Sequence, residues 1–130
     1  MPTHKHTLSV TTPEGAVTKK VSVTGDANEG LDVTIAGLAT DTLVNVAFTQ
    51  AGLKSIYIVT DQDLSLETNA TNHASGDIIA LSANKPLQWY TGGPVPLTTW
   101  FNFDVTKFYF TNAGATAANV TIRILRDSTP

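Results

Sequence analysis

Short runs in which apolar and polar residues alternate are the feature that most constrains the fold of this chain. In residues 120 to 124 a valine and two isoleucines share one face, while a threonine and an arginine share the other. That period of two is expected of a β-strand with one buried face. The same period recurs in residues 17 to 23 and 31 to 35. The pattern predicts antiparallel β-structure with almost no helix.

The runs and the turn residues between them predict an all-β fold. We expect an antiparallel β-sandwich of the jelly-roll kind, with about eight to ten short strands. Residues 5 to 11 and 17 to 24 are expected to form a first hairpin, because Pro and Gly lie between them. Residues 42 to 50 and 53 to 60 alternate clearly and are expected to be central strands.

The stretch from residue 104 to residue 126 is the best patterned in the chain. Two apolar runs flank Asn112, Ala113 and Gly114, residue types that suit tight turns with positive φ. We therefore predict that this stretch forms a β-hairpin on which the rest of the chain packs.

A chain of 130 residues fits a single domain, which at that size buries roughly two-thirds of the surface of its unfolded chain. We expect one sandwich spanning residues 1–130, with residues 1–6 as a candidate extended N-terminal arm. The sequence contains no cysteine, so disulfides and thiolate metal sites are excluded. Synthesis in a reducing compartment is the simpler expectation.

Charge and hydropathy exclude several classes of function. A net charge of −3 with 15% charged residues disfavours binding to nucleic acid, for which a protein needs a basic face. The sequence also lacks the polybasic segment that would indicate binding to a membrane surface. The first ten residues lack the apolar core of a secretory signal. We expect a protein made in the cytoplasm, which would leave the cell by another route, such as inside a virus particle.

No catalytic group of residues is apparent, so we expect neither an enzyme nor a cofactor. A Gly-x-Ser-x-Gly nucleophile motif is absent. His73 lies in a polar loop without an identifiable acid. Asp104, close to Trp100, is the nearest candidate for a glycosidase acid, but that chemistry needs a pair of carboxylates.

Two patterns are compatible with a metal ion, and each has a simpler interpretation. His4 and His6 are two residues apart and share a face of the first expected strand. Such a pair near a terminus more often faces solvent. Asp61 and Asp63 have the spacing of calcium ligands, but the other EF-hand positions are missing and turn-forming side chains explain them better. We therefore predict no metal site.

Aromatic residues crowd into one stretch of the chain, around a loop rich in Pro and Gly. They either fill one end of the core or form a contact surface for another protein or a sugar ring. Adjacent aromatic residues in an extended chain point to opposite faces, which favours partial exposure. The candidate interface residues are Trp89, Tyr90, Pro94, Pro96, Trp100, Phe101 and Phe103.

The run FDVTKFYFTNAGATAANVTIRILRD, residues 103 to 127, follows a Pro-Leu pair and a Trp. It resembles the C-terminal portion of small head proteins of tailed bacteriophages, the cement or decoration proteins on the outside of capsids. The resemblance covers about a fifth of the chain and transfers no site residue. It implies a jelly-roll or related sandwich that oligomerises, binds the major capsid protein and bridges capsid subunits on the virion exterior.

A symmetric homo-oligomer is expected, with a trimer favoured over a dimer because shells offer threefold sites. The alternative function is a carbohydrate-binding, lectin-like module, in which Trp89 or Trp100 would stack on a sugar ring.

Overall fold

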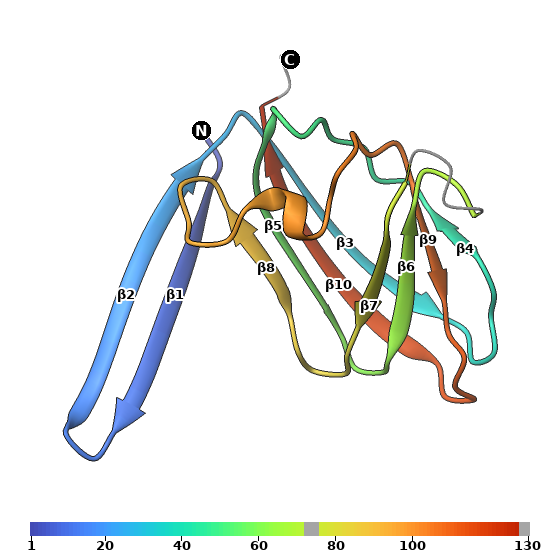
Figure 1. The fold of residues 1–130 in the computed structure, drawn as a ribbon, viewed down its shortest axis with the longest axis horizontal. Coiled ribbons are helices and arrows are strands. Elements are labelled where there is room, and N and C mark those ends of the chain that lie inside the picture. Colours follow the sequence, from blue (N-terminus) through green and yellow to red (C-terminus); the bar gives the residue numbers. More distant parts are fainter. Residues whose placement is uncertain (72–75, 128–130) are drawn as a thin grey trace.

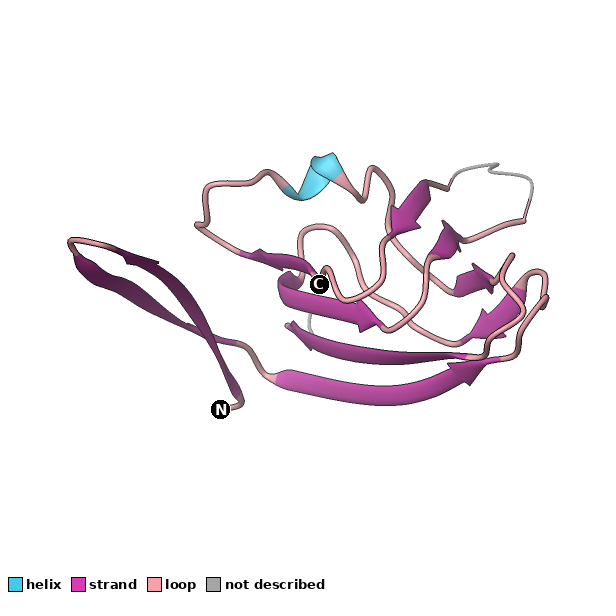
Figure 2. Ribbon diagram, turned by 90° about the horizontal axis from the view of Figure 1, so that it is seen from below, coloured by secondary structure: helices cyan, strands magenta, loops and turns pink. Residues whose placement is uncertain are grey.

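The computed structural model describes residues 1–71 and 76–127, and it consists almost entirely of antiparallel β-strands (Figures 1 and 2). His73 lies outside the described residues. The strands are β1 (Thr3–Thr12), β2 (Gly15–Thr24), β3 (Ala27–Ile35), β4 (Thr42–Val44), β5 (Leu53–Thr60), β6 (Leu64–Thr68), β7 (Ile78–Leu81), β8 (Leu87–Tyr90), β9 (Phe108–Thr111) and β10 (Ala118–Arg126). A single 3-10 turn, η1 (Leu97–Thr99), interrupts the loop after β8 in the described part of the chain.

Eight of the strands form two packed four-stranded sheets. The first sheet has the order β3-β10-β5-β8 and the second has the order β4-β9-β6-β7. From β3 to β10, every connection except that between β6 and β7 carries the chain from one sheet to the other. This is jelly-roll topology, and the prediction of an all-β antiparallel sandwich is confirmed.

The core fills the space between the two sheets with aliphatic and aromatic side chains. Val120, Ile122 and Ile124 of β10 are buried there, as their alternation predicts. Four phenylalanines pack together at the end of the sandwich that the loop after β8 covers, with ring centroids 5.3 to 6.4 Å apart: Phe48, Phe101, Phe108 and Phe110. Burial of this apolar area is the main source of stability in a chain without disulfides.

The predicted hairpin over residues 104 to 126 is wrong. β9 pairs with β4 and β6 in the second sheet, whereas β10 pairs with β3 and β5 in the first. Residues 112 to 117 therefore cross from one sheet to the other instead of turning back. β9 is also short, and its side chains alternate between the buried Phe108 and Phe110 and the partly exposed Tyr109.

Residues 42 to 50 were expected to form a central strand, and this is also wrong. β4 ends at Val44 and lies at the edge of the second sheet. Val46 and Phe48 are still buried, and Phe48 makes a single bridge to Val105. The alternation was thus correct about which side chains face the core but not about how far the strand continues. Residues 53 to 60 do form a central strand, β5.

The first two strands stand apart from the sandwich. β1 and β2 pair only with each other along their full length, from Thr3 opposite Thr24 to Thr12 opposite Gly15. The predicted first hairpin is therefore confirmed. Figures 1 and 2 show that this N-terminal hairpin, residues 3 to 24, projects from the sandwich, with its chain-terminal end beside the sandwich and its turn far from it. Residues 3 to 6, expected as part of an extended arm, are the first residues of β1.

Candidate functional site

The N-terminal hairpin is amphipathic along its whole length. Because paired residues share a face, the register places His6 beside Val21, Leu8 beside Lys19 and Val10 beside Val17. We call this side the apolar face; it also carries His4 and Val23. The opposite face is built from Thr, Ser and Lys residues and Ala16.

The base of the apolar face packs on the outer side of the first sheet. Val23, with Val21 beside it, forms a small cluster with Tyr90 and Leu125. The ring of His6 lies 4.6 Å from that of Tyr90. The cluster explains why Leu125 is fully buried although it points away from the main core: the hairpin covers it.

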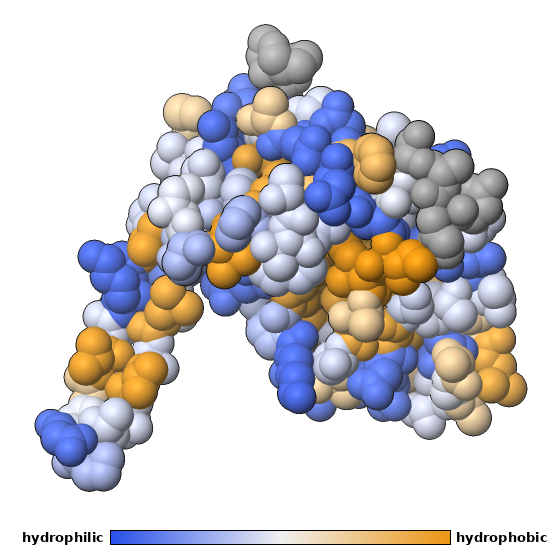
Figure 3. Space-filling view, viewed as in Figure 1, coloured by the Kyte–Doolittle hydropathy of each residue, from blue (hydrophilic) through white to orange (hydrophobic). Residues whose placement is uncertain are grey.

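The distal part of the apolar face is exposed. Val10 is 61% exposed and Val17 is 70% exposed, while Leu8 is about half exposed. Leu8 lines a narrow cleft of about 110 Å³ against Trp89 and the loop at residues 93 to 95. The space-filling view shows apolar residues gathered on the hairpin well away from the sandwich (Figure 3). Apolar side chains are thus displayed on an arm whose other face is polar.

A chain of hydrogen bonds fixes the base of the hairpin to the sandwich. Gln88 Nε2 lies 2.7 Å from His6 Nδ1, and His6 Nε2 lies 2.7 Å from Ser55 Oγ. Ser55 Oγ lies 2.9 Å from His4 Nδ1, and His4 Nε2 lies 2.7 Å from Asn28 Oδ1. Every donor meets an acceptor if Gln88 donates to His6, His6 to Ser55, Ser55 to His4 and His4 to Asn28. That arrangement requires both imidazoles to be neutral.

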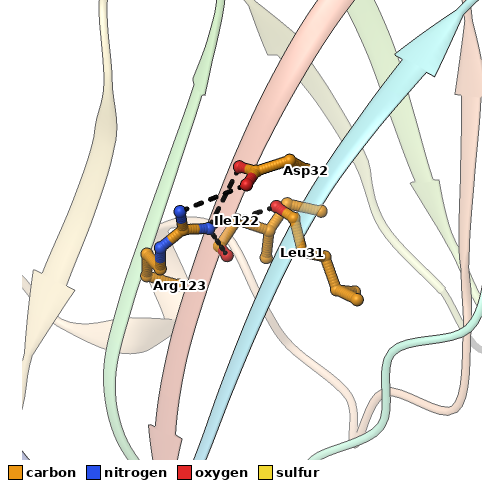
Figure 4. Close-up of polar contacts among 4 residues, drawn as sticks. All are labelled: Leu31, Asp32, Ile122 and Arg123. Atoms are coloured by element: carbon orange, nitrogen blue, oxygen red, sulfur yellow. Dashed lines mark hydrogen bonds and ion pairs between the residues drawn. The ribbon is translucent and has the colours of Figure 1, made fainter.

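The surroundings of His6 favour its neutral imidazole. Burial lowers the pKa of His6 below its ordinary value of 6.5, and the nearby His4 lowers it further. Lys5 and Arg123 line the groove beside these histidines. Arg123 is held by the carbonyls of Leu31 and Ile122 and by the carboxylate of Asp32, which partly balances its charge (Figure 4).

We expect acid to loosen the hairpin from the sandwich. Since the folded protein lowers the pKa of His6, the unfolded chain binds more protons below pH 6.5, and stability falls as the pH decreases through that range. Urea unfolding at pH 7.5 and pH 5.5 measures the loss. His6→Gln removes the titrating group and should reduce the pH dependence. An equal pH dependence in the variant and the parent would contradict this role for His6.

An open groove of about 630 Å³ lies beside the base, between the hairpin and the first sheet. Most of its lining residues are of polar types and include His4, Asn28, Tyr57 and Gln88. A serine between two histidines resembles a nucleophile with its base, but Ser55 is fully buried and the outer histidine meets an amide, not a carboxylate. A nucleophile must reach its substrate, so these contacts serve to attach the hairpin.

Of the candidate interface residues, the structure brings Trp89, Tyr90 and Pro94 to one cleft, beside Leu8, and does not gather all seven on one surface. Phe101 is fully buried in the core and Tyr90 is buried in the small cluster under the hairpin. Trp89 and Trp100 are partly buried against the main core, and Trp89 Nε1 donates to the carbonyl of Val95. The members that remain exposed are Pro94, Pro96 and Phe103. An interface built on this stretch stays a prediction. Two of its candidate rings, Tyr90 and Phe101, are buried inside the molecule.

The acidic candidates hold loops in place. Asp61 accepts hydrogen bonds from the backbone and side chain of Asn119, which lower its pKa. Asp63 accepts from the backbone of Ala83, and Asp104 from that of Gln50. Within residues 1–71 and 76–127, no group of three or more His, Asp or Glu side chains is placed to hold a metal ion.

Sequence reasoning missed Ser55 and Gln88, because their roles depend on contacts with histidines about 50 to 80 residues away. The distal apolar face could be predicted from the sequence, because the alternation in the two strands places Leu8, Val10 and Val17 on one face. The sequence did not show that the turn end of the hairpin extends beyond the sandwich.

Comparisons with models of protein families, with curated proteins and with solved structures find no match to this chain. In the part of the chain that the structure describes, no helix is long and apolar enough to cross a membrane.

Proposed function

We propose that this chain is a non-enzymatic structural protein that binds the outside of a bacteriophage capsid and stabilises it by bridging capsid subunits. Its partner in that role is the major capsid protein. It is made in the host cytoplasm and is carried on the exterior of the virion.

The observation that carries this proposal is the distal apolar face of the projecting hairpin. Val10 and Val17 are exposed on an arm whose base is held to its own sandwich. Contiguous apolar surface on a soluble protein typically marks contact with another protein. A folded body with such an arm suits a protein whose work is assembly.

Two further points support a capsid. The jelly roll is an architecture that viral capsid proteins use, although a fold alone does not determine function. The run of residues 103 to 127 resembles phage decoration proteins. A protein that binds only the assembled shell stabilises it by mass action, and many copies multiply the effect.

The jelly roll also occurs in lectins, so the carbohydrate-binding alternative needs its own comparison. Stacking on a sugar requires an accessible aromatic face. Trp89 and Trp100 both pack partly against the core, and the indole N–H of Trp89 is already used by Val95. The arm therefore supports an assembly role more strongly than these rings support a glycan site.

Co-sedimentation with empty phage heads tests the proposal. The heads are assembled from the major capsid protein encoded in the same genome. We expect the protein to sediment with the heads to a fixed stoichiometry and to raise their disruption temperature. A glycan array measured in parallel should show no binding. Protein that stays in the supernatant, or that binds glycans and not heads, would refute the capsid role.

A further inference from the structure

We propose that the distal part of the N-terminal hairpin of one copy docks on the outer face of the second sheet of a neighbouring copy. The contact joins copies head to tail into a closed symmetric ring. The inference rests on the proposed assembly role and names the occupant of the exposed apolar face. It can be tested on the purified protein without a capsid.

The donor surface is narrow and one-sided. Val10 and Val17 are directly opposed in the hairpin, and Leu8 opposes Lys19 one step nearer the base. Ser9 and Thr18 are paired on the reverse face. The donor surface is therefore apolar with one cation, Lys19, within it.

Charge identifies a second copy's sandwich, and not a second hairpin, as the matching surface. Residues 1 to 24 contain three lysines and one glutamate, a net charge of +2. The remaining residues contain five basic and ten acidic side chains, a net charge of −5. Two hairpins would repel each other, whereas a hairpin and the sandwich of another copy attract.

In the described residues, carboxylates of the same chain do not balance the hairpin's charge. Among the described residues, Lys5, Lys19 and Lys20 form no ion pair. The ion pairs that are present join strands of the first sheet to each other or to the residue that follows its last strand. Lys19, the one cation on the donor surface, is thus available to another chain.

The outer face of the second sheet has the complementary character. The register places Leu43, Tyr109, Glu67 and Ile78 side by side in one row across its four strands. Leu43 is 50% exposed and Ile78 is 58% exposed, so both ends of the row are apolar and accessible.

A shallow groove of about 280 Å³ lies beside this row. It is lined by Asp63, Ala80 and Thr111 among others. An apolar surface with a carboxylate, Asp63, at its rim matches an apolar hairpin that carries one lysine.

The positions of the two surfaces favour a ring. The hairpin projects at one side of the molecule and the second sheet lies at the other (Figure 1), so one surface of each copy meets a different surface of the next. Such heterologous contacts close into rings when the rotation between copies permits. The five residues from Leu8 to Thr12 reach roughly 15 Å along the strand, so one contact is small and closure, which gives every copy two contacts, adds stability.

Single-cysteine variants test the contact, because the natural sequence has no cysteine. Val17→Cys and Ile78→Cys are prepared as separate proteins, mixed, and treated with a short thiol crosslinker. We expect a crosslinked dimer that requires both variants. Thr18→Cys mixed with Ile78→Cys is the matched control on the reverse face and should crosslink at least tenfold less. Efficient crosslinking of Val17→Cys to itself would show hairpin-to-hairpin pairing and overturn the proposal.

Sedimentation equilibrium gives the second readout. We expect Val17→Asp to weaken self-association at least tenfold, because it places a carboxylate in the apolar contact. Thr18→Asp adds the same charge to the adjacent, polar-face position and should change association less than threefold. Both sites are exposed, so the variants should keep the parent's urea midpoint.

The outcomes separate this inference from the capsid role. A parent protein that stays monomeric at 100 µM but sediments with empty heads refutes the ring contact and leaves the capsid role standing. An oligomer that depends on the hairpin but does not sediment with empty heads supports the ring contact and refutes the capsid role. Equal losses of association in Val17→Asp and Thr18→Asp would also refute the contact, since the apolar face would then have no special part in it.

Discussion

We expect Phe101→Ala to lower the free energy of unfolding by about 3 to 5 kcal/mol. Phe101 is fully buried, and its ring packs edge-on against Phe48 at 5.3 Å and stacks on Phe108 at 6.2 Å. Removing the ring loses its transfer free energy and leaves a cavity between two other rings. Since domains are typically stable by only about 5 to 15 kcal/mol, this change removes a large part of the total.

The two neighbouring aromatic residues provide matched controls. Trp100→Ala should cost clearly less than Phe101→Ala, because Trp100 is only partly buried against the core. Phe103 is 42% exposed, so Phe103→Ala should cost the least. Urea midpoints of the three variants give the order directly. If Trp100→Ala or Phe103→Ala were as destabilising as Phe101→Ala, the position of the core at this end of the sandwich would be wrong.

The same stretch shows what alternation can and cannot predict. Adjacent aromatic residues were expected to point to opposite faces, and Trp100 and Phe101 do differ in burial. Their order could not be predicted, because they follow the 3-10 turn η1 and do not lie in a strand. Periodicity of two assigns faces only where the backbone is extended.

The C-terminal stretch shows a second limit. The alternation in residues 120 to 124 correctly identified the buried face of β10. It carried no information about the partner strand, and the turn-forming residues at 112 to 114 suggested the nearest one. The actual partners of β10 are β3 and β5, about 60 to 90 residues earlier in the chain. Jelly-roll pairing is long-range, whereas turn signals are local.

The candidate site also has features that local sequence predicts and features that depend on long-range contacts. The two faces of the N-terminal hairpin follow from local alternation and a local turn, and both were predictable. The attachment of the hairpin at Ser55 and Gln88 depends on contacts between distant segments. How much of the apolar face remains exposed depends on where the sandwich ends, which no short window of sequence records.

The second large effect is expected at Asn112, whose side chain organises the crossing between the two sheets. Asn112 is almost fully buried. Its Nδ2 donates to the carbonyl of Thr116 at 2.8 Å and, at a longer distance, to that of Ile35, while its Oδ1 accepts from the backbone N–H of Gly114. Asn112→Ala removes these bonds, one of them buried and two part-buried, and empties a buried polar site, so we expect a loss of about 2 to 3 kcal/mol.

Asn119→Ala is the matched control, because Asn119 also bonds through its amide, to Asp61 and Thr34, but is exposed. Water can replace those bonds, so the loss should stay below about 1 kcal/mol. Urea unfolding of both variants measures the difference. Equal losses would mean that Asn112 is not a special element of the crossing. A loss at Asn112 alone would show that a residue with the sequence signature of a hairpin turn instead fixes the passage of the chain from one sheet to the other.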